Sequence, residues 1–230
     1  MTPLLSVIIP ARNEATALPL LLADLAPLRA AGAELIVVDG GSSDATCALA
    51  AAQADKVLET SAGRALQMNA GAAVARAEYL WFVHADTRVS AASIRHLLVT
   101  LAERPIWGRF DVRLSGSGLA LRLIGTMINL RSRLTGVATG DQAIFVAREA
   151  FEALGGYADI PLMEDIELSG RLKERARPRC LRPPLSTSSR RWEHDGIWRT
   201  VLFMWRLRLA YYRGVSPDQL ARQYHRGPPL

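Results

Sequence analysis

Short hydrophobic runs alternate with helical patterns over the first 105 residues. The runs are rich in Val and Ile, as is typical of strands buried on both faces of a sheet. Strands are expected near residues 4–10, 34–39, 56–59 and 79–84, and helices near 15–30, 44–53, 64–77 and 91–103. This alternation indicates repeated βαβ units, and it therefore predicts a mostly parallel sheet with right-handed crossovers.

The second part of the chain is less regular, and Pro105 marks its start. Strands or extended segments are expected at residues 107–114, 143–146 and 179–189, and helices at 119–134, 164–175 and 197–212. The predicted fold class is α/β, with one domain over residues 1–190 and a helical extension over residues 191–230.

Two of the hydrophobic runs end in a carboxylate, Asp39 and Asp86. Ligands of open α/β sheets bind at the carboxyl ends of the strands, so we expect both side chains to project into one crevice. A buried acid without a partner is costly. A bound nucleotide and a divalent cation would account for both acids.

The positive charge is unevenly distributed along the chain. The net charge is +6, yet residues 171–230 contain 14 Lys and Arg against 4 Asp and Glu. This stretch carries no nucleic-acid-binding motif, so no nucleic-acid partner is expected. An anionic membrane surface and a phosphorylated ligand fit the charge equally well. A coding bias also fits, because Lys56 and Lys173 are the only lysines.

Cysteine usage and hydropathy indicate a cytoplasmic protein. Cys47 and Cys180 stand alone, which argues against a zinc site or a disulfide framework. Strand-like sequence begins at Leu4 without a preceding basic patch, so a signal peptide is not expected. No run approaches the roughly 18 apolar residues of a membrane span.

Five segments occur in an order that resembles family 2 glycosyltransferases with the GT-A fold, the group that includes dolichol-phosphate mannose synthases. They are SVIIPARNE (6–14), VDGGSSD (38–44), HAD (84–86), MEDIEL (163–168) and SSRRW (188–192). GRALQMNAGAA (63–73) and TGDQAIF (139–145) are similar to the small bacterial glycosyltransferases of radical-SAM gene clusters, which are connected with arsenosugar biosynthesis. The resemblance implies a Rossmann-like sheet, with a nucleotide-binding half over residues 1–105 and an acceptor and catalytic half over 106–190.

The resemblance implies that the donor is a nucleotide-diphospho-sugar, with UDP-sugars as the expected class. Asp39 would bind the base or the ribose, although such an acid could also cap a helix, a role that Asp44 fills better. The implied donor-site residues are Pro10, Ala11, Arg12, Glu14, Asp39, Gly41, Ser42, Asp44, Arg64, Asn69, His84 and Ala85.

Asp86 is the implied metal ligand. The family's DxD element holds Mg²⁺ or Mn²⁺ through its last acid, and such hard cations combine few carboxylates with substrate phosphates. Here His84 replaces the first acid of that element. An isolated His in a hydrophobic strand is also typical of a packed, hydrogen-bonded residue, so a ligand role for His84 stays open.

Asp165 is the implied general base, which would deprotonate the acceptor hydroxyl in one inverting displacement. Glu164 and Asp165 could equally be acids favoured by the dipole of the first helical turn. The resemblance places further residues at the acceptor or the diphosphate: Asp141, Gln142, Glu164, Arg191 and Trp192.

Several alternatives to this function stay open or are disfavoured. Ser188 replaces the Gln that processive polysaccharide synthases keep, which argues against such a synthase. A transferase acting on a lipid phosphate at the inner membrane face, and an inactive nucleotide-sugar-binding protein, are the remaining rivals. A Rossmann dehydrogenase is disfavoured because PARNEA replaces the Gly-rich turn. The helix over 197–212 would either dock on the domain or lie in a membrane interface.

Overall fold

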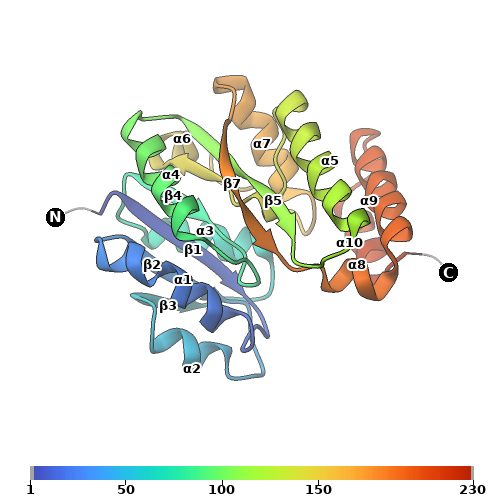
Figure 1. Cartoon of the computed structure of the whole chain (residues 1–230). Coiled ribbons are helices and arrows are strands. Elements are labelled where there is room, and N and C mark those ends of the chain that lie inside the picture. Colours follow the sequence, from blue (N-terminus) through green and yellow to red (C-terminus); the bar gives the residue numbers. More distant parts are fainter. Residues whose placement is uncertain (1–2, 229–230) are drawn as a thin grey trace.

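A seven-stranded sheet runs through the molecule in the computed structural model, which describes residues 3–228 except for the side chains of Arg191, Trp192 and His194. The strand order is β3-β2-β1-β4-β6-β5-β7 (Figure 1). The strands are β1 (Leu5–Ala11), β2 (Glu34–Asp39), β3 (Lys56–Glu59), β4 (Tyr79–Phe82), β5 (Trp107–Leu114), β6 (Phe145–Ala147) and β7 (Arg179–Thr187). The structure therefore confirms the predicted α/β fold class.

Helices cover both faces of the sheet, and the last helices of the chain lie beside it near the C-terminus (Figure 1). They are α1 (Leu18–Ala30), α2 (Thr46–Ala51), α3 (Arg64–Val74), α4 (Ala91–Ala102), α5 (Leu119–Thr135), α6 (Arg148–Ala153), α7 (Glu164–Arg175), α8 (Arg190–Asp195), α9 (Ile197–Tyr212) and α10 (Pro217–Arg226). A short 3₁₀ turn, η1 (Gly140–Gln142), precedes β6. Within the described residues, no helix is both long enough and apolar enough to cross a bilayer.

The order in which the chain adds strands to the sheet reverses at β1: β2 and β3 are added on one side of it and β4 on the other. The strands β3, β2, β1 and β4 are mutually parallel, and β2 and β4 lie on opposite sides of β1. The carboxyl ends of β1 and β4 therefore form a topological switch point, where ligands of α/β sheets bind. Beyond β4, the strand β6 is antiparallel to both of its neighbours, and β7 is parallel to β5.

Alternating residues of β1 fill two hydrophobic cores. Val7 and Ile9 pack with α1 and α4, whereas Ile8 packs with α3 on the opposite face of the sheet. Gly71 lets α3 approach closely, because a Cβ at that position would lie 2.5 Å from Ile8 Cγ2. Because neither face of β1 meets water, its residues 7–11 read as a continuous apolar run.

Three helices were not predicted from the sequence, and one predicted helix cap is wrong. The six-residue helices α6 and α8 are too short to show a 3.6-residue periodicity. The start of α10 could have been predicted, since Ser216 is a favoured N-cap residue and Pro217 is favoured at the first position of a helix. Asp44 does not cap α2, which begins at Thr46 with Ala45 at the cap position. Asp44 instead joins two loops, because it accepts from Thr46 N at 3.0 Å and Ala15 N at 3.2 Å.

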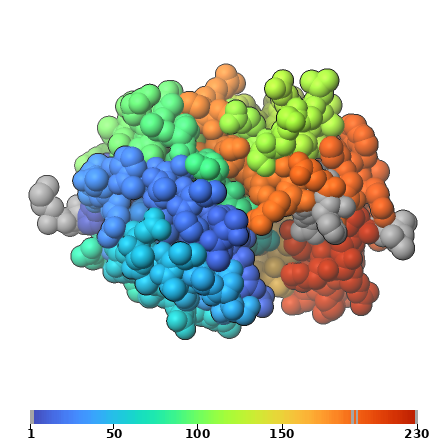
Figure 2. Space-filling model, turned by 60° about the horizontal axis from the view of Figure 1, so that its bottom comes forward, coloured from blue at the N-terminus to red at the C-terminus, as the bar shows by residue number. Residues whose placement is uncertain are grey.

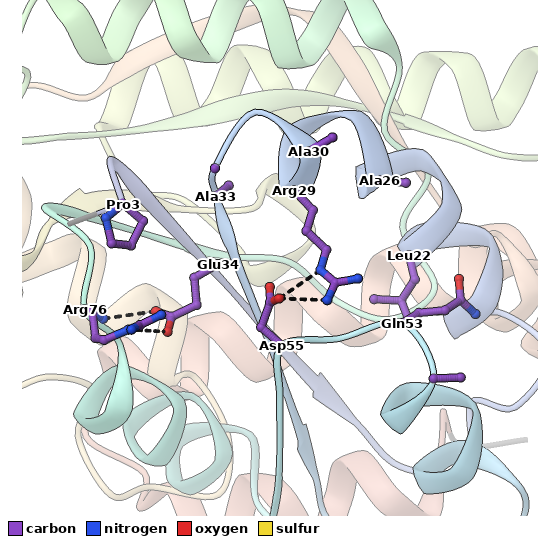
Figure 3. A pocket seen from close by; sticks show the side chains of 12 residues that line it. Pro3, Leu22, Ala26, Arg29, Ala30, Ala33, Glu34, Gln53, Asp55 and Arg76 are labelled. Carbon is purple, nitrogen blue, oxygen red and sulfur yellow. Dashed lines mark hydrogen bonds and ion pairs between the residues drawn. The ribbon is translucent and has the colours of Figure 1, made fainter. Parts of the chain in front are cut away.

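A buried acid, Glu34, ties the amino-terminal ends of the first strands together (Figure 3). Its carboxylate accepts hydrogen bonds from Ser6 Oγ at 2.7 Å and from Arg76 N and Nε at 3.0 Å each. Lys56 Nζ lies 2.9 Å from the same carboxylate. Burial alone would raise the pKa of Glu34, but these donors outweigh it and lower that pKa to about 2.

Glu34→Gln is expected to lower the free energy of unfolding by about 3 kcal/mol at pH 7 and by less at pH 3. The folded pKa lies below the ordinary value of 4.5, so the stabilisation is present above pH 4.5 and is lost as the pH falls toward 2. Denaturant unfolding at both pH values measures the change. Glu78→Gln, at an exposed position, is the control. Equal losses at both pH values for Glu34→Gln would contradict the account.

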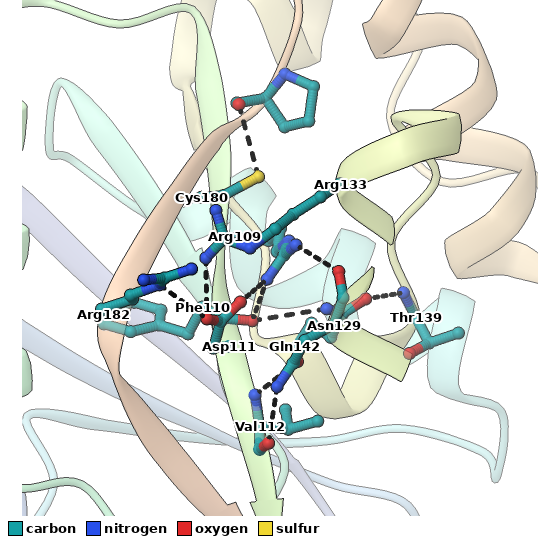
Figure 4. A network of polar contacts seen from close by, with 11 residues as sticks. Arg109, Phe110, Asp111, Val112, Asn129, Arg133, Thr139, Gln142, Cys180 and Arg182 are labelled. Carbon is teal, nitrogen blue, oxygen red and sulfur yellow. Dashed lines mark hydrogen bonds and ion pairs between the residues drawn. The ribbon is translucent and has the colours of Figure 1, made fainter. Parts of the chain in front are cut away.

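A second polar network fixes α5 against β5 (Figure 4). The fully buried Arg109 pairs with Asp111, and Arg133 from α5 lies 2.7 Å from the same carboxylate. Asn129 of α5 bonds both the N–H and the C=O of Val112, at 2.9 Å each. These contacts hold α5 in a defined orientation beside the sheet, which matters because one side of this helix lines a groove.

Candidate functional site

A cavity of about 320 Å³ opens at the carboxyl ends of β1 and β4, at the switch point of the sheet. Figure 2 shows the N-terminal half (blue and cyan) and the C-terminal helices (orange and red) side by side on the face turned forward. The cavity is lined by residues from both parts: Pro10, Ala11, Arg12, Glu14, Arg64, Gln67, His84, Ala85, Asp86, Asp141, Thr187, Ser188 and Tyr224.

Most of the implied donor-site residues line this cavity. Nine of the residues named from the sequence are among the lining: Pro10, Ala11, Arg12, Glu14, Arg64, His84, Ala85, Asp86 and Asp141. The sequence analysis missed Gln67, Thr187, Ser188 and Tyr224. Gln67 links the ends of two strands, since its amide donates to Ala11 O at 2.9 Å and Val38 O at 2.8 Å.

Asp39 has its polar contacts satisfied by the loop that follows it. The carboxylate is buried and accepts from Gly41 N at 3.0 Å and Ser42 N at 2.7 Å. The Ser42 hydroxyl also donates to it. The expectation that this acid lacks a partner within the fold is therefore wrong. Asp39 and Ser42 shape the loop beside the cavity rather than line the cavity itself.

Two other predicted residues make contacts that hold the fold together. Asn69 bonds both to Tyr157 O at 2.8 Å and to Tyr157 N at 2.9 Å, which joins α3 to the loop before α7. Gln142 is fully buried and caps η1 through Thr139 N at 3.2 Å. The fold uses the polar atoms of both side chains, so we leave Asn69 and Gln142 out of the proposed ligand contacts.

Two carboxylates and one guanidinium meet at the end of β4. Arg190 Nη2 lies 3.3 Å from Glu14 Oε2 and 3.8 Å from Asp86 Oδ2. Burial and then the neighbouring charge of Asp86 raise the pKa of Glu14, and Arg190 offsets part of this rise. The pair of acids therefore favours a cation between them, a place that Arg190 takes here. From the segment SSRRW, the sequence analysis selected Arg191 and Trp192 instead of Arg190. The side chains of Arg191 and Trp192 lie outside the described part of the structure.

The donor set at Glu14 and Asp86 fits a hard divalent cation only in part. Carboxylate oxygens are the ligands that Mg²⁺ and Mn²⁺ prefer. Among the described residues, however, no group of three or more His, Cys, Asp or Glu side chains is arranged to hold a metal. Phosphate oxygens of a substrate would have to complete the coordination, as is usual for Mg²⁺.

His84 forms an ion pair across the cavity with Asp141. His84 Nδ1 lies 3.5 Å from Asp141 Oδ1, and its ring is mostly buried. Burial alone would lower the pKa of His84, but the hydrogen bond and charge of Asp141 outweigh it and raise that pKa above its ordinary value. The same contact outweighs burial at Asp141 and lowers the pKa of its carboxyl. The geometry thus gives His84 a partner within the fold.

Asp141→Asn is expected to lower the pKa of His84 by removing its charged partner. In the wild-type protein the raised pKa favours the imidazolium, so this ion pair stabilises the fold below pH 6.5 and is lost as the pH rises through the folded pKa. An NMR titration of the imidazole protons without divalent cations measures the pKa in both proteins. The same His84 pKa in the variant would show that Asp141 does not raise it.

The Asp165 carboxylate is held at the start of α7. Its Oδ2 accepts from Gly140 N at 2.6 Å, and its Oδ1 accepts from Ile166 N at 2.7 Å. Gly140 also packs on the imidazole, since a Cβ there would lie 2.6 Å from His84 Cε1 and 3.6 Å from Asp165 Oδ2. Asp165 therefore lies close to His84 without lining the cavity itself.

Glu164 is buried beside Asp165 and retains an unpaired oxygen. Its Oε1 pairs with Arg64 Nε at 3.0 Å, whereas Oε2 has no hydrogen-bond partner. Burial raises the pKa of Glu164, and Arg64 offsets this only in part. The preceding residue, Met163, has a φ of 71°, an uncommon conformation for a non-glycine residue. Strained backbone next to buried acids is typical of functional sites.

Sequence comparison identifies a family. The model described as "Glycosyl transferase family 2" matches residues 6–152, more than half of the chain. This span includes the first three segments of the resemblance and ends before Asp165. No protein with a curated function matches the chain.

Structural comparison identifies the fold. TarS of S. aureus, residues 1–349 in complex with UDP, superposes with a TM-score of 0.65 at 17% identity over 80% of this chain. The chain spans 60% of the length of that TarS chain. Mannosyltransferase PcManGT from Pyrobaculum calidifontis, in complex with GDP-Man and Mn²⁺, superposes with a TM-score of 0.59 at 18% identity, over 98% of this chain and 69% of that one. At such identities, the likeness shows a shared GT-A fold.

Proposed function

Because the chain belongs to glycosyl transferase family 2, we propose that it is a metal-dependent, inverting glycosyltransferase that uses a UDP-sugar. The acceptor would be a hydroxyl group. The observation that carries the proposal is the cavity at the switch point, where Glu14, Asp86 and Arg64 gather at the ends of adjacent elements. Two of the similar proteins support a nucleotide-sugar donor, since TarS was crystallised with UDP and PcManGT is in complex with GDP-Man.

The donor would lie across the ends of β1 and β4. The loop after β1, with Arg12 and Glu14, and the loop after β2, closed by Asp39 and Ser42, would hold the nucleoside. Arg64 lines the cavity and Arg190 lies beside two of its lining carboxylates, and guanidinium groups suit diphosphate oxygens. Asp86 and Glu14 would hold the divalent cation together with those oxygens. When bound, this cation supplies charge neutralisation for the leaving diphosphate.

Asp165 would act as the general base. The acceptor oxygen forms the new bond to the anomeric carbon from the side opposite the diphosphate, and the bond to that leaving group breaks. Asp165 takes the acceptor's proton, and the electron pair of the broken bond leaves with the nucleoside diphosphate. The N–H groups of Gly140 and Ile166 hold the carboxylate in place for this transfer.

An inactive nucleotide-sugar-binding protein is the second candidate function. The His84–Asp141 ion pair favours it, because His84 stands where the family's element has an acid and already has an internal partner. Measured sugar transfer separates the two candidates, because only an enzyme releases the nucleoside diphosphate.

Thermal unfolding with a panel of nucleotide-sugars, each with and without Mn²⁺, tests the proposed function. A donor that binds only the native state raises the unfolding temperature by mass action. We expect the largest rise for a UDP-sugar in the presence of Mn²⁺. A panel in which no nucleotide-sugar stabilises the protein under either condition would contradict the proposal.

A further inference from the structure

An apolar groove of about 610 Å³ lies between α5 and α9, which are both labelled at the right of Figure 1. Its walls contain large hydrophobic side chains that are about half exposed or more: Leu123, Met127, Leu130, Leu134, Trp198, Trp205, Leu209 and Tyr212. Monomeric proteins rarely expose so many large apolar residues on one surface. On α5 these residues recur every three or four positions, and on α9 they recur at intervals of seven, four and three, so each helix presents one apolar stripe.

The floor of this groove carries two arginines with unpaired donors. Arg131 Nε and Nη2 and Arg208 Nε are buried and have no hydrogen-bond partner, and both residues line the groove. A buried donor without a partner is costly, because it has lost its hydrogen bonds to water and gained none in the protein. Burial and then the charge of Arg208 lower the pKa of Arg131 to about 10. An anionic group in the groove would satisfy these donors and relieve the repulsion between the two guanidinium groups.

The groove is continuous with the proposed donor site. Asp141 lines both the groove and the donor cavity. Thr139, which also lines the groove, precedes Gly140, whose N–H holds Asp165. A ligand anchored at Arg131 therefore lies next to the proposed general base, whose charge already influences Arg131.

We propose that this groove binds the acceptor, and that the acceptor is a lipid with a phosphate for Arg131 and Arg208 and a free hydroxyl for Asp165. The inference rests on the proposed function, because it names the acceptor of that reaction. The hydrocarbon chain lies between the apolar stripes of α5 and α9, where burial of its CH₂ groups away from water favours binding.

Charge favours a lipid over a second copy of the chain as the occupant. A two-fold dimer through this face would bring Arg131 and Arg208 of both copies together, with like charges opposed. Three exposed arginines, Arg122, Arg206 and Arg213, lie on or just beyond the same two helices. Basic residues beside an apolar and Trp-containing surface are typical of helices that lie at the interface of anionic membranes.

Binding of lysophosphatidylglycerol below its micelle concentration tests the inference, because this probe has one acyl chain, a phosphate and free hydroxyls. Trp198 and Trp205 line the groove, so their fluorescence reports binding without any activity measurement. We expect saturable binding with a blue shift, and binding at least tenfold weaker for the uncharged dodecyl maltoside. Absence of saturable lysophosphatidylglycerol binding, or equal affinity for both amphiphiles, would overturn the inference.

Matched variants separate the groove from general surface effects. Leu130→Asp, at a 55% exposed wall position, is expected to weaken binding at least tenfold, whereas Val99→Asp, 67% exposed on α4, should leave it unchanged. Arg208→Gln should weaken binding of lysophosphatidylglycerol but not of dodecyl maltoside, and Arg95→Gln on α4 is its control. Far-ultraviolet circular dichroism confirms that each variant is folded. Unchanged affinity in folded Leu130→Asp would overturn the inference. A wild-type protein that is a dimer and binds no lipid, together with a monomeric Leu130→Asp variant, would also overturn it.

Failure of the inference and failure of the proposed function give different results. A protein that UDP-sugars stabilise but that does not bind the lipid overturns only the inference. A protein that binds the lipid but no nucleotide-sugar overturns the proposed function, and with it the role of this lipid as an acceptor.

Discussion

Asp165→Asn is expected to lower turnover by about two orders of magnitude or more, the usual scale for loss of a general base. The substitution keeps the shape of the side chain but removes its capacity to take the acceptor's proton. Donor affinity should change little, because Asp165 is not among the residues that line the donor cavity. Steady-state kinetics with a saturating donor measure turnover, and calorimetric titration of UDP measures donor affinity.

The hydrogen bonds of Asp165 call for a stability control. Gly140 N and Ile166 N both donate to the carboxylate, so an amide at this position would place an NH₂ group opposite one N–H. Some loss of stability is therefore expected, at about 1–3 kcal/mol. Glu174→Gln, an exposed acid of the same helix, is the matched control. Turnover within a few-fold of wild type in a folded Asp165→Asn protein would remove Asp165 from the role of base.

Asp86→Ala is expected to abolish the metal-dependent part of nucleoside diphosphate binding while the fold stays intact. The side chain is 28% exposed at the end of β4, and its ion-pair contact is the distant one to Arg190 at 3.8 Å. Its removal therefore leaves no buried group unpaired. Calorimetry of UDP with and without Mn²⁺, in wild type and variant, measures the metal enhancement.

A second variant separates the loss of a ligand from the loss of charge balance. Glu14→Gln removes the other carboxylate beside Arg190 and keeps Asp86 in place. We expect Glu14→Gln to reduce the metal enhancement in part and Asp86→Ala to remove it. If Asp86→Ala retains the full enhancement of wild type, then Asp86 does not hold the metal.

Much of the fold could be predicted because its buried strands appear in the sequence as short runs of apolar residues. The strands β1 and β2 are buried on both faces, so their inner residues, 7–11 and 35–38, read as unbroken apolar runs. The helices α7 and α9 were predicted at their observed limits, since each is long enough to show periodicity. The short helices α6 and α8 were missed because six residues span less than two turns.

The candidate site was harder to predict, because its chemistry depends on which partners the fold supplies. The strand ends predicted that Asp86 faces a crevice, but they also suggested that Asp39 lacks a partner, whereas the loop after β2 satisfies it. The contact between Glu14 and Arg190 joins residues 176 positions apart, so no local pattern reveals it. The likeness to the radical-SAM-associated subgroup stays a prediction.

The groove was outside the reach of sequence reasoning for a related reason. The pattern of α9 suggested either docking or a membrane interface, and the basic residue Arg208 stands among its apolar positions. In the structure both features belong to one surface, because α9 lies beside α5 and Arg208 lies in the floor between them. Pairing of two distant helices, rather than the periodicity of one, creates the proposed acceptor site.

The anomeric configuration of the released sugar tests the central claim most directly. ¹H NMR follows the slow reaction of the best-stabilising α-linked donor with Mn²⁺ and with water as the acceptor, which needs no knowledge of the natural acceptor. A single displacement predicts that the β-anomer of the sugar appears first, together with UDP, and that the α-anomer follows by mutarotation. Initial release of the α-anomer, or no enzyme-dependent release of sugar from any donor that stabilises the protein, would contradict the account.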